Sequence, residues 1–231
     1  MKLLALDTAT EACSAAVLVG GRTLARFETA GRSHTEKLVP MVQALLAEAG
    51  LGYAQLDGYV CGVGPGSFAG VRIGVSFVKG LSLAHERPVV GVSSLAMLAV
   101  PALRAGAHRV LAAIDARMDE VYFACYARGA DGLPALVGEE TVCAPAEAPR
   151  CVGEAAAAGT GWGASEMALR AATGARLQAM DGAALPRAED ALAIALPRFA
   201  RGEAISAAWL LPRYLRNKVA LTLAEQRARR V

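Results

Sequence analysis

The order of strand and helix patterns over its first hundred residues constrains the fold of this chain most strongly. Three short strand patterns come first, over residues 3–6, 13–19 and 22–28, and Gly20-Gly21 between the last two suits a tight hairpin turn. Apolar spacing then predicts helices over residues 35–49, 68–83 and 94–103, with strands over 59–63 and 88–92 between them. A meander followed by alternating helices and strands predicts a mixed sheet with helices packed on its faces.

A second series of strands begins after Arg104-Ala105-Gly106, which reads as a boundary. Strand patterns cover residues 109–114, 121–126 and 135–140, and alanine-rich helix patterns cover 164–173 and 188–201. The first half has the element order of one half-domain of actin-like ATPases and sugar kinases, and the second half reads as a reduced copy, although no sequence repeat accompanies it. We therefore predict an α/β protein with two related lobes, residues 1–104 and 105–231.

The composition is that of a globular protein with a large core, because 55% of the 231 residues are hydrophobic and 19% are charged. The longest apolar runs are too short to cross a bilayer, and the start of the chain reads as a strand rather than a signal peptide. The five cysteines are scattered and the three histidines lie far apart, which predicts neither a disulfide framework nor local metal-ligand spacing. We expect a soluble, cytoplasmic protein with reduced thiols and no membrane partner.

Basic residues gather at the C-terminal end, although the net charge of the chain is only +3. From residue 213 onward, six basic residues and one acidic residue, Glu225, give this basic segment a net charge of +5. The basic residues are Arg213, Arg216, Lys218, Arg227, Arg229 and Arg230. Two interpretations remain open. The segment is either the solvated end of a helix, where the helix dipole favours cations, or a contact with RNA.

A turn after the first strand, Asp7-Thr8-Ala9-Thr10, is a candidate phosphate-binding turn. Asp7 is suited to orienting a metal-bound water, while Thr8 and Thr10 offer hydroxyl groups. The turn contains no glycine that would let phosphate approach the backbone closely. An Asx or ST turn that ends a strand explains the same residues.

A second candidate turn lies in the stretch GVGPGSFAGVRIG, residues 62–74. It is not a Walker A loop, since no Lys-Ser or Lys-Thr follows its glycines, and its spacing differs from the dinucleotide fingerprint. Gly64 and Gly66 flank a proline between a strand and a helix, and Ser67 is suited to capping that helix. The amides of Gly66, Ser67 and Phe68 would attract an anion, so a tight turn and an anion site remain as two interpretations.

Other reactive groups form no obvious constellation in the sequence. The candidate nucleophiles Ser67, Ser93, Ser94 and Cys61 have only the distant His34 and His85 as histidine bases. The charged turn at residues 115–120 is either functional or, as we prefer, an Arg–carboxylate clamp.

The helix predicted over residues 68–83 carries more apolar surface than one face of a sheet requires. Its apolar side chains point in most directions, and Gly70, Gly74 and Gly80 permit close approach of another backbone. Either a partner covers its second face or the helix is buried within its own chain.

Six stretches spread over residues 4–220 together resemble the TsaB family of tRNA threonylcarbamoyladenosine biosynthesis proteins. They read LALDTATEACSAA, SHTEKLVPMV, GVGPGSFAGVRIGVSFVKGLS, PVVGVSSLAML, IDARMDEVYFA and LLPRYLRNKVA. The resemblance implies the actin-like ATPase fold (ASKHA, ribonuclease H-like). It also implies a non-catalytic role in bacterial modification of adenosine 37 of tRNA, beside the catalytic paralogue TsaD and the ATPase TsaE.

The resemblance also implies a missing metal site. Ser94 and Leu98 occupy the positions of two metal-binding histidines of TsaD, and a leucine has no lone pair to offer a metal. We therefore expect no metal or cofactor on this chain alone, with ATP and a metal held by its partners. On this basis GVGPGSFAGVRIG is interpreted mainly as a structural turn and an interface helix.

In the family, the two helices matching residues 35–49 and 68–83 pack on TsaD or on a second TsaB copy. The partner surface is expected to include Leu38, Met41, Val42, Leu45, Val71, Gly74, Val75, Phe77, Val78 and Leu81. The leading hypothesis is a scaffold subunit that activates TsaD, is a homodimer in isolation, and meets tRNA indirectly or through the basic segment. The alternatives are a weak ATPase or kinase using Asp7 and residues 64–67, and a peptidase acting on TsaD through Ser67 or Ser94.

Overall fold

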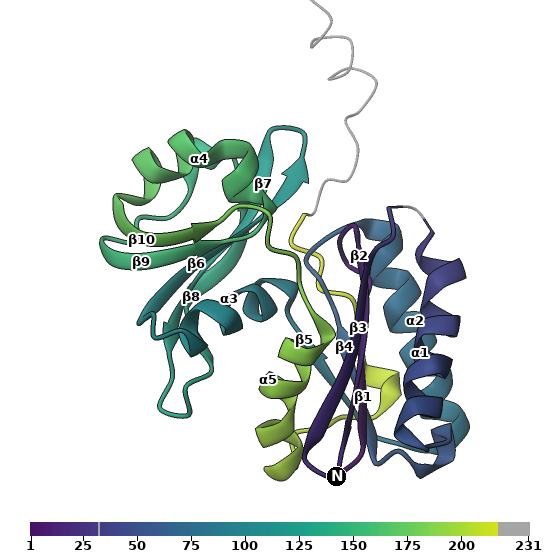
Figure 1. The fold of residues 1–231 in the computed structure, drawn as a ribbon. Helices are drawn as coiled ribbons and strands as arrows, with labels where there is room; N and C mark the ends of the chain where they lie inside the picture. The colour runs from purple at the N-terminus through teal and green to yellow at the C-terminus, as the bar shows by residue number, and fades with distance from the viewer. Residues whose placement is uncertain (32, 217–231) are drawn as a thin grey trace, which may run out of the picture.

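The computed structural model describes residues 1–31 and 33–216, which form two lobes, each built around a five-stranded sheet (Figure 1). The first sheet has the order β3-β2-β1-β4-β5 and the second the order β8-β7-β6-β9-β10. The first sheet consists of β1 (Leu3–Asp7), β2 (Ala12–Val19), β3 (Arg22–Thr29), β4 (Gly58–Gly62) and β5 (Val89–Val92). The second consists of β6 (Arg109–Arg117), β7 (Glu120–Arg128), β8 (Pro134–Cys143), β9 (Gly153–Ala158) and β10 (Ala175–Asp181).

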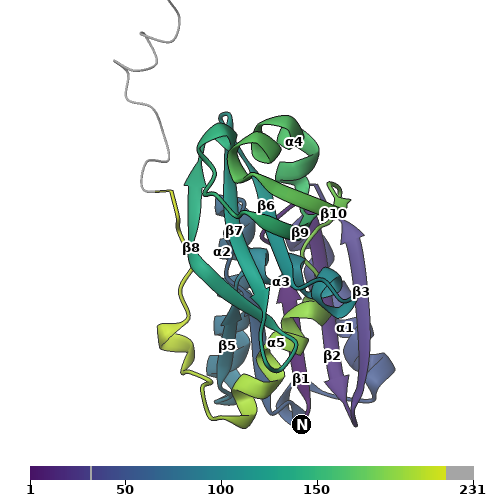
Figure 2. The same cartoon turned by 90° about the vertical axis from the view of Figure 1, so that its left-hand side faces the viewer.

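Helices cover both faces of each sheet (Figures 1 and 2). They are α1 (His34–Ala49), α2 (Phe68–His85), α3 (Ser94–Arg104), α4 (Thr160–Thr173) and α5 (Ala188–Ala200), with short 3-10 turns η1 (Tyr53–Gln55), η2 (Pro145–Glu147) and η3 (Ala207–Trp209). On the first sheet, α1 and α2 share one face and α5 lies on the other. On the second sheet, α3 and α4 lie on opposite faces. Within the described ranges, no helix is long and apolar enough to cross a membrane.

The two lobes share one strand topology. In the first, β1 pairs antiparallel with β2 and parallel with β4, and the outer strands extend the sheet on both sides. Strands β6 to β10 repeat this pattern one for one. The second lobe has only η2 between β8 and β9, where the first has α1 between β3 and β4. The predicted α/β fold with two related lobes, the second reduced, is confirmed.

The structure differs from the expected division at residue 104. The two sheets fall on either side of it, but α5 packs on the first sheet and α3 packs on the second. The apolar stripe of α5 explains its position, because Ala188, Ala191, Leu192 and Ala195 are buried at helical spacing against that sheet. Each lobe therefore contributes a helix to the other.

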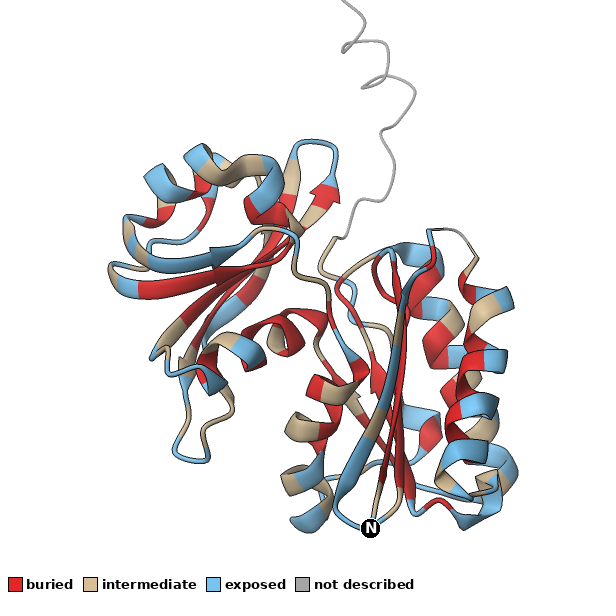
Figure 3. Cartoon of the chain, in the orientation of Figure 1, coloured by how far each residue is buried: buried red, intermediate tan, exposed pale blue. Residues whose placement is uncertain are grey.

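Burial follows this layering (Figure 3). Every residue of β1 and of β4 is buried, because both strands lie inside the first sheet with helices on both faces. Strand β3 is an edge strand and is mostly exposed. The carboxyl end of β1 thus opens toward the junction of the lobes from a rigid, buried strand.

Candidate functional site

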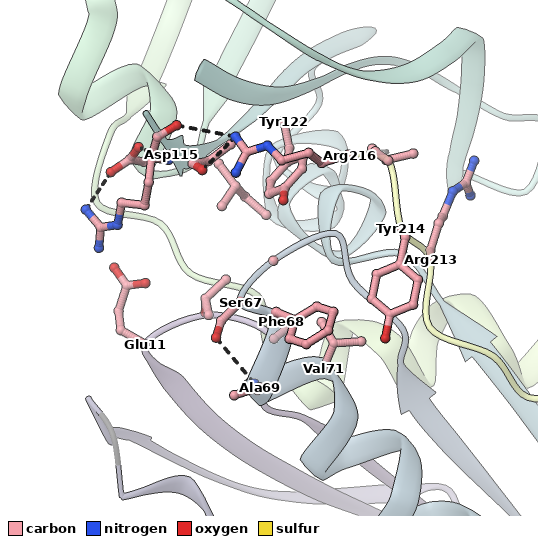
Figure 4. Close-up of a pocket in the computed structure, with 18 of the residues that line it drawn as sticks. Glu11, Ser67, Phe68, Ala69, Val71, Asp115, Tyr122, Arg213, Tyr214 and Arg216 are labelled. Carbon is pink, nitrogen blue, oxygen red and sulfur yellow. Dashed lines mark hydrogen bonds and ion pairs between the residues drawn. The ribbon is translucent and has the colours of Figure 1, made fainter. Parts of the chain in front are cut away.

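A cleft of about 670 Å³ lies between the lobes (Figure 4). Its walls come from the β1–β2 turn, the N-terminus of α2, the β6–β7 turn and residues 213–216. Its size and its mixture of apolar and charged side chains are typical of small-molecule sites. Both candidate turns found in the sequence reach this cleft, which makes it the candidate functional site.

Asp7 lies beneath the cleft and does not line it. The side chain is fully buried, its Oδ1 accepts a hydrogen bond from the amide of Ala9 at 3.1 Å, and the Ser94 hydroxyl donates to its Oδ2 at 3.4 Å. Burial raises the pKa of Asp7 to about 7, against the opposing effect of these two hydrogen bonds. The carboxyl group is therefore held inside the first lobe rather than presented to a ligand in the cleft.

The two threonines of the same turn also bond within the chain. The hydroxyl of Thr8 donates to the carbonyl of Gly70 at 2.7 Å, and that of Thr10 accepts from the amide of Ala12 at 3.3 Å. His34 Nε2 lies 2.8 Å from the carbonyl of Thr10. Of the three predicted residues Asp7, Thr8 and Thr10, the last is the one that lines the cleft.

The glycine-rich stretch packs directly on this turn. The amide of Ser67 donates to the carbonyl of Ala9 at 2.6 Å, and the Ser67 hydroxyl caps α2 by accepting from the amide of Gly70 at 3.3 Å. A Cβ at Gly66 would overlap with the carbonyl of Ala9, and one at Gly70 with that of Thr8. Backbone lies on backbone here, which only glycine permits. This packing supports the interpretation as a tight turn. Of the three amides that would bind an anion, that of Ser67 already donates to Ala9.

The candidate nucleophiles are engaged elsewhere. Ser67 and Ser93 cap helices, and Ser94 donates to Asp7. Cys61 is buried, and burial raises the pKa of its thiol. The structure does not bring these groups together as a nucleophile and its base.

The opposite wall of the cleft is the charged β6–β7 turn. Arg117 Nη1 lies 2.7 Å from Asp115 Oδ2, which confirms the predicted clamp. Arg117, Met118 and Asp119 all have positive φ, a conformation that non-glycine residues adopt at some energetic cost. Arg216 holds the turn from outside by donating to Glu120 and to the carbonyl of Ala116.

The sequence did not reveal the aromatic cluster at the mouth of the cleft. The Arg72 guanidinium lies 3.6 Å from the centroid of the Phe68 ring and donates to the Tyr214 hydroxyl at 2.8 Å. Figure 4 shows Phe68 and Tyr214 side by side. Tyr214 lies in the Pro-Arg-Tyr-Leu-Arg stretch at residues 212–216. Because 142 positions separate it from Arg72, no local sequence pattern predicts this pair.

Two relatives decide the family. A protein of Escherichia coli (strain K12) named tRNA threonylcarbamoyladenosine biosynthesis protein TsaB is 45% identical over 235 residues, covering 95% of this chain and 96% of that protein. The protein of the same name from Haemophilus influenzae is 39% identical over 232 residues and 95% of each chain. The chain belongs to the TsaB family.

Two further comparisons find similarity of this chain to the TsaD family model and to solved structures from Pseudomonas aeruginosa. The family model described as TsaD, tRNA N6-adenosine threonylcarbamoyltransferase, matches residues 27–162. A crystal structure of an uncharacterized Pseudomonas aeruginosa protein with similarity to peptidase YEAZ has a TM-score of 0.86 and 47% identity, covering 93% of this chain and 99% of that one. A structure described as YeaZ from the same organism has a TM-score of 0.84.

Ser94 and Leu98, the positions compared with metal ligands of TsaD, are both buried in this TsaB chain. Ser94 bonds to Asp7, and Leu98 packs in the core under the second sheet, close to Gly159. In the described part of the chain, no three His, Cys, Asp or Glu side chains are grouped as a metal site would require. Both side chains are thus buried, and neither lines the interlobe cleft.

Most of the residues expected at the partner surface lie inside the chain. Eight of its ten residues face the chain's own first sheet: Leu38, Met41, Val42, Leu45, Val71, Gly74, Val75 and Val78. A helix on a sheet turns its apolar stripe inward, which accounts for these residues. Phe77 and Leu81 remain partly exposed, and Val39 and Leu83 are exposed on the same two helices.

Proposed function

We propose that this chain takes part in tRNA threonylcarbamoyladenosine biosynthesis as a non-catalytic subunit that binds and activates TsaD, working with the ATPase TsaE. The names of its relatives support the pathway. The match of residues 27–162 to the TsaD family model supports a shared origin with the transferase. The role of a subunit rather than a second transferase rests on the residues of the site.

The contact between Asp7 and Ser94 carries the proposal. In this fold the carboxylate at the end of the first strand is suited to binding a metal ion beside phosphate. In this chain that carboxylate, Asp7, is buried beneath the β1–β2 turn and accepts a hydrogen bond from Ser94. The Ser67 amide and the Thr8 hydroxyl, which would contact phosphate, bond within the chain instead. The polar groups of the turn thus stabilise the chain's own packing.

The outer sides of α1 and α2 are the proposed TsaD-binding surface. Leu83 is 68% exposed and Val39 is 38% exposed, and Phe77 and Leu81 are partly exposed one turn apart on α2. Exposed apolar side chains on adjacent helices favour association with a helical partner, and a stable interface buries roughly 800 Å² per partner. In the absence of TsaD, the same surface would pair with a second copy of the chain.

Reconstitution tests the proposal. Purified chain is added to TsaD, TsaE, ATP, threonine, bicarbonate and unmodified tRNA together with the enzyme that forms the threonylcarbamoyl donor, and modified adenosine is measured by mass spectrometry. We expect product only when the chain is present. Product formation that does not depend on the chain would overturn the proposal.

A charge on the outer side of α2 separates docking from folding. Leu83→Glu is expected to weaken binding to TsaD at least about tenfold, because a carboxylate would be buried in the interface. Met167→Glu is the matched control, since Met167 is 86% exposed on α4 of the other lobe. Equal binding by both variants would exclude this surface.

A contact with tRNA through the basic segment remains part of the proposal. Arg213 and Arg216 already form ion pairs with Glu140 and Glu120. Lys218, Arg227, Arg229 and Arg230 lie outside the described residues. Removal of residues 217–231 is expected to lower both the tRNA affinity of the complex and its dependence on salt.

One observation favours a second function, nucleotide binding. The cleft has the volume of a small-molecule site and carries Arg117, Tyr214 and Tyr122 on its walls. Calorimetry of the isolated chain with ATP and Mg²⁺ tests it, and a heat of binding lost in Arg117→Ala would support it.

A further inference from the structure

A second cavity, of about 620 Å³, lies apart from the interlobe cleft and shares no lining residue with it. Its walls are one side of α3, the carboxyl ends of β9 and β10, the end of β3, and the connection from β10 into α5. Strands β9 and β10 run parallel to each other and to β6. In open sheets of parallel strands, ligands bind outside the carboxyl ends of the strands. The cavity therefore occupies the position in the second lobe where a ligand is expected.

Short side chains leave this space open. Its lining is mostly apolar, and the strand ends and the following connection present alanines where leucine or valine would fill the volume: Ala156, Ala158, Ala179, Ala183 and Ala184. Met97 and Leu98 of α3 close the opposite side. Several lining residues, among them Ala179, Asp181 and Arg187, are exposed, so the cavity is open to solvent on one side and has a size typical of small-molecule sites.

Asp190 supplies a buried negative charge at one end of the cavity. It lies in the first turn of α5, lines the cavity and is only 3% exposed. Its Oδ1 lies 3.6 Å from Nη1 of Arg104, which is beyond hydrogen-bond distance, and the Arg104 side chain is 63% exposed. No side chain or backbone amide of the described residues donates a hydrogen bond to the carboxylate, whose oxygens keep some contact with solvent.

The surroundings of Asp190 leave its charge undercompensated. Burial is the largest influence on its pKa and raises it to about 6, despite the opposing effect of Arg104. Arg187, the other nearby cation, lies over the Phe27 ring at 4.3 Å and pairs with Glu189 at 3.6 Å. A largely buried carboxylate whose nearest cation lies beyond hydrogen-bond distance would be stabilised by a positively charged donor that enters the cavity.

We propose that this cavity binds a small organic cation, an ammonium or guanidinium group on an apolar body. The cation contacts Asp190, and the body lies against the alanines of β9 and β10 and the side chains of α3. The charged residues of the lining are two carboxylates, Asp181 and Asp190, and one cation, Arg187, which is paired with Glu189, so a cationic ligand is favoured over an anionic one. The proposal is independent of the function proposed above, because no residue of the interlobe cleft takes part.

Isothermal titration of the full chain with 2-phenylethylamine tests the proposal, with 2-phenylethanol as the neutral probe of the same shape. We expect the amine to bind saturably and at least about tenfold more tightly than the alcohol, as a charge-assisted contact in a buried site predicts. No saturable binding of the amine up to its solubility limit, or equal affinity for amine and alcohol, would overturn the proposal.

Three variants locate the binding. Asp190→Asn is expected to reduce the amine's affinity to that of the alcohol and leave the alcohol unchanged. Ala184→Phe fills the cavity and is expected to abolish binding of both probes. Asp119→Asn removes an exposed carboxylate from the β6–β7 turn and is expected to leave the binding of both probes unchanged. If the amine still bound with unchanged affinity to both Asp190→Asn and Ala184→Phe, its binding site would lie outside this cavity and the proposal would be wrong. Thermal melting checks that each variant is folded, and the preference of the native chain for amine over alcohol stands as a test without any of them.

Discussion

Arg213 joins the two lobes through Glu140. Its Nε lies 3.1 Å from Oε2 of Glu140 on β8, while its backbone amide donates to the carbonyl of Val63 in the first lobe at 2.8 Å. The Glu140 side chain is 1% exposed, and the Tyr126 hydroxyl donates to its other oxygen at 2.5 Å. Removing the cation from a buried carboxylate leaves an unpaired charge, so this pair contributes to the mutual position of the lobes.

Arg213→Ala is therefore expected to lower the free energy of unfolding by about 2 kcal/mol at neutral pH. The loss is smaller than for a fully buried pair, because Arg213 is 44% exposed and Tyr126 keeps its bond to Glu140. Urea denaturation measures it. Arg176→Ala is the control, since Arg176 and Glu154 pair at 3.2 Å with side chains 80% and 55% exposed, and such pairs contribute about 0–1 kcal/mol. Equal losses in the two variants would show that burial of Glu140 is not decisive.

Two glycines of α2 are expected to respond in opposite directions to the same substitution. Gly70→Ala forces a methyl group into the carbonyl of Thr8 and is expected to destabilise the protein by about 2 kcal/mol or more. Gly80→Ala is expected to stabilise it by about 0.5–1 kcal/mol, because a Cβ at Gly80 meets nothing within 4 Å and alanine is the better helix former. Thermal unfolding of the pair measures the contrast.

The two variants control for each other, since both change one glycine of one helix. If Gly70→Ala were as stable as Gly80→Ala, α2 would not pack closely on the β1–β2 turn. The explanation of the GVGPGSFAGVRIG stretch as a structural turn would then fail with it.

Elements with local signals were predictable. The Gly20-Gly21 turn has positive φ at both residues, as a primed hairpin turn requires. The helix predicted over residues 188–201 from its alanine content is observed as α5, residues 188–200, because alanine favours the helix and the segment also buries an apolar stripe.

Strands β9 and β10 escaped prediction for a physical reason. Strand β9 has the sequence GEAAAA, and alanine has the highest helix propensity of all residues. It is a strand because it pairs with β6 and β10 and lies buried between α3 and α4, a context outside its own sequence. Strand β10 is a mostly exposed edge strand without a clear alternation of burial.

The candidate site was also predictable only in its local features. The two turns that reach the cleft carried glycine, proline and hydroxyl signals that are readable locally. Their roles depended on contacts between distant residues, such as Ser94 with Asp7 across 87 positions and Thr8 with Gly70 across 62. Whether a turn faces a ligand or packs on another turn is settled by such pairs, which no spacing rule reports.

Asp7 makes the stability of the protein depend on pH. Its pKa is raised by burial to about 7 in the folded protein, whereas the ordinary value is 3.8. Between these values the folded state holds a proton that the unfolded state has released, so the free energy of unfolding falls as the pH rises through this range. Below pH 3.8 both states are protonated, and above about pH 7 both are ionised, so the contribution of Asp7 is constant outside the window.

Asp7→Asn removes this titration while keeping an oxygen for the Ala9 amide and supplying a donor toward Ser94. The variant is expected to gain stability relative to the native chain as the pH rises from 4 to 7, by up to about 4 kcal/mol, because one pKa unit corresponds to about 1.4 kcal/mol. Urea denaturation at several pH values measures the difference. Asp119→Asn, which removes an exposed carboxylate, controls for the change in net charge. A difference between the Asp7 variant and the native chain that stays constant from pH 4 to pH 8 would mean that Asp7 is not buried as a protonated acid beneath the turn.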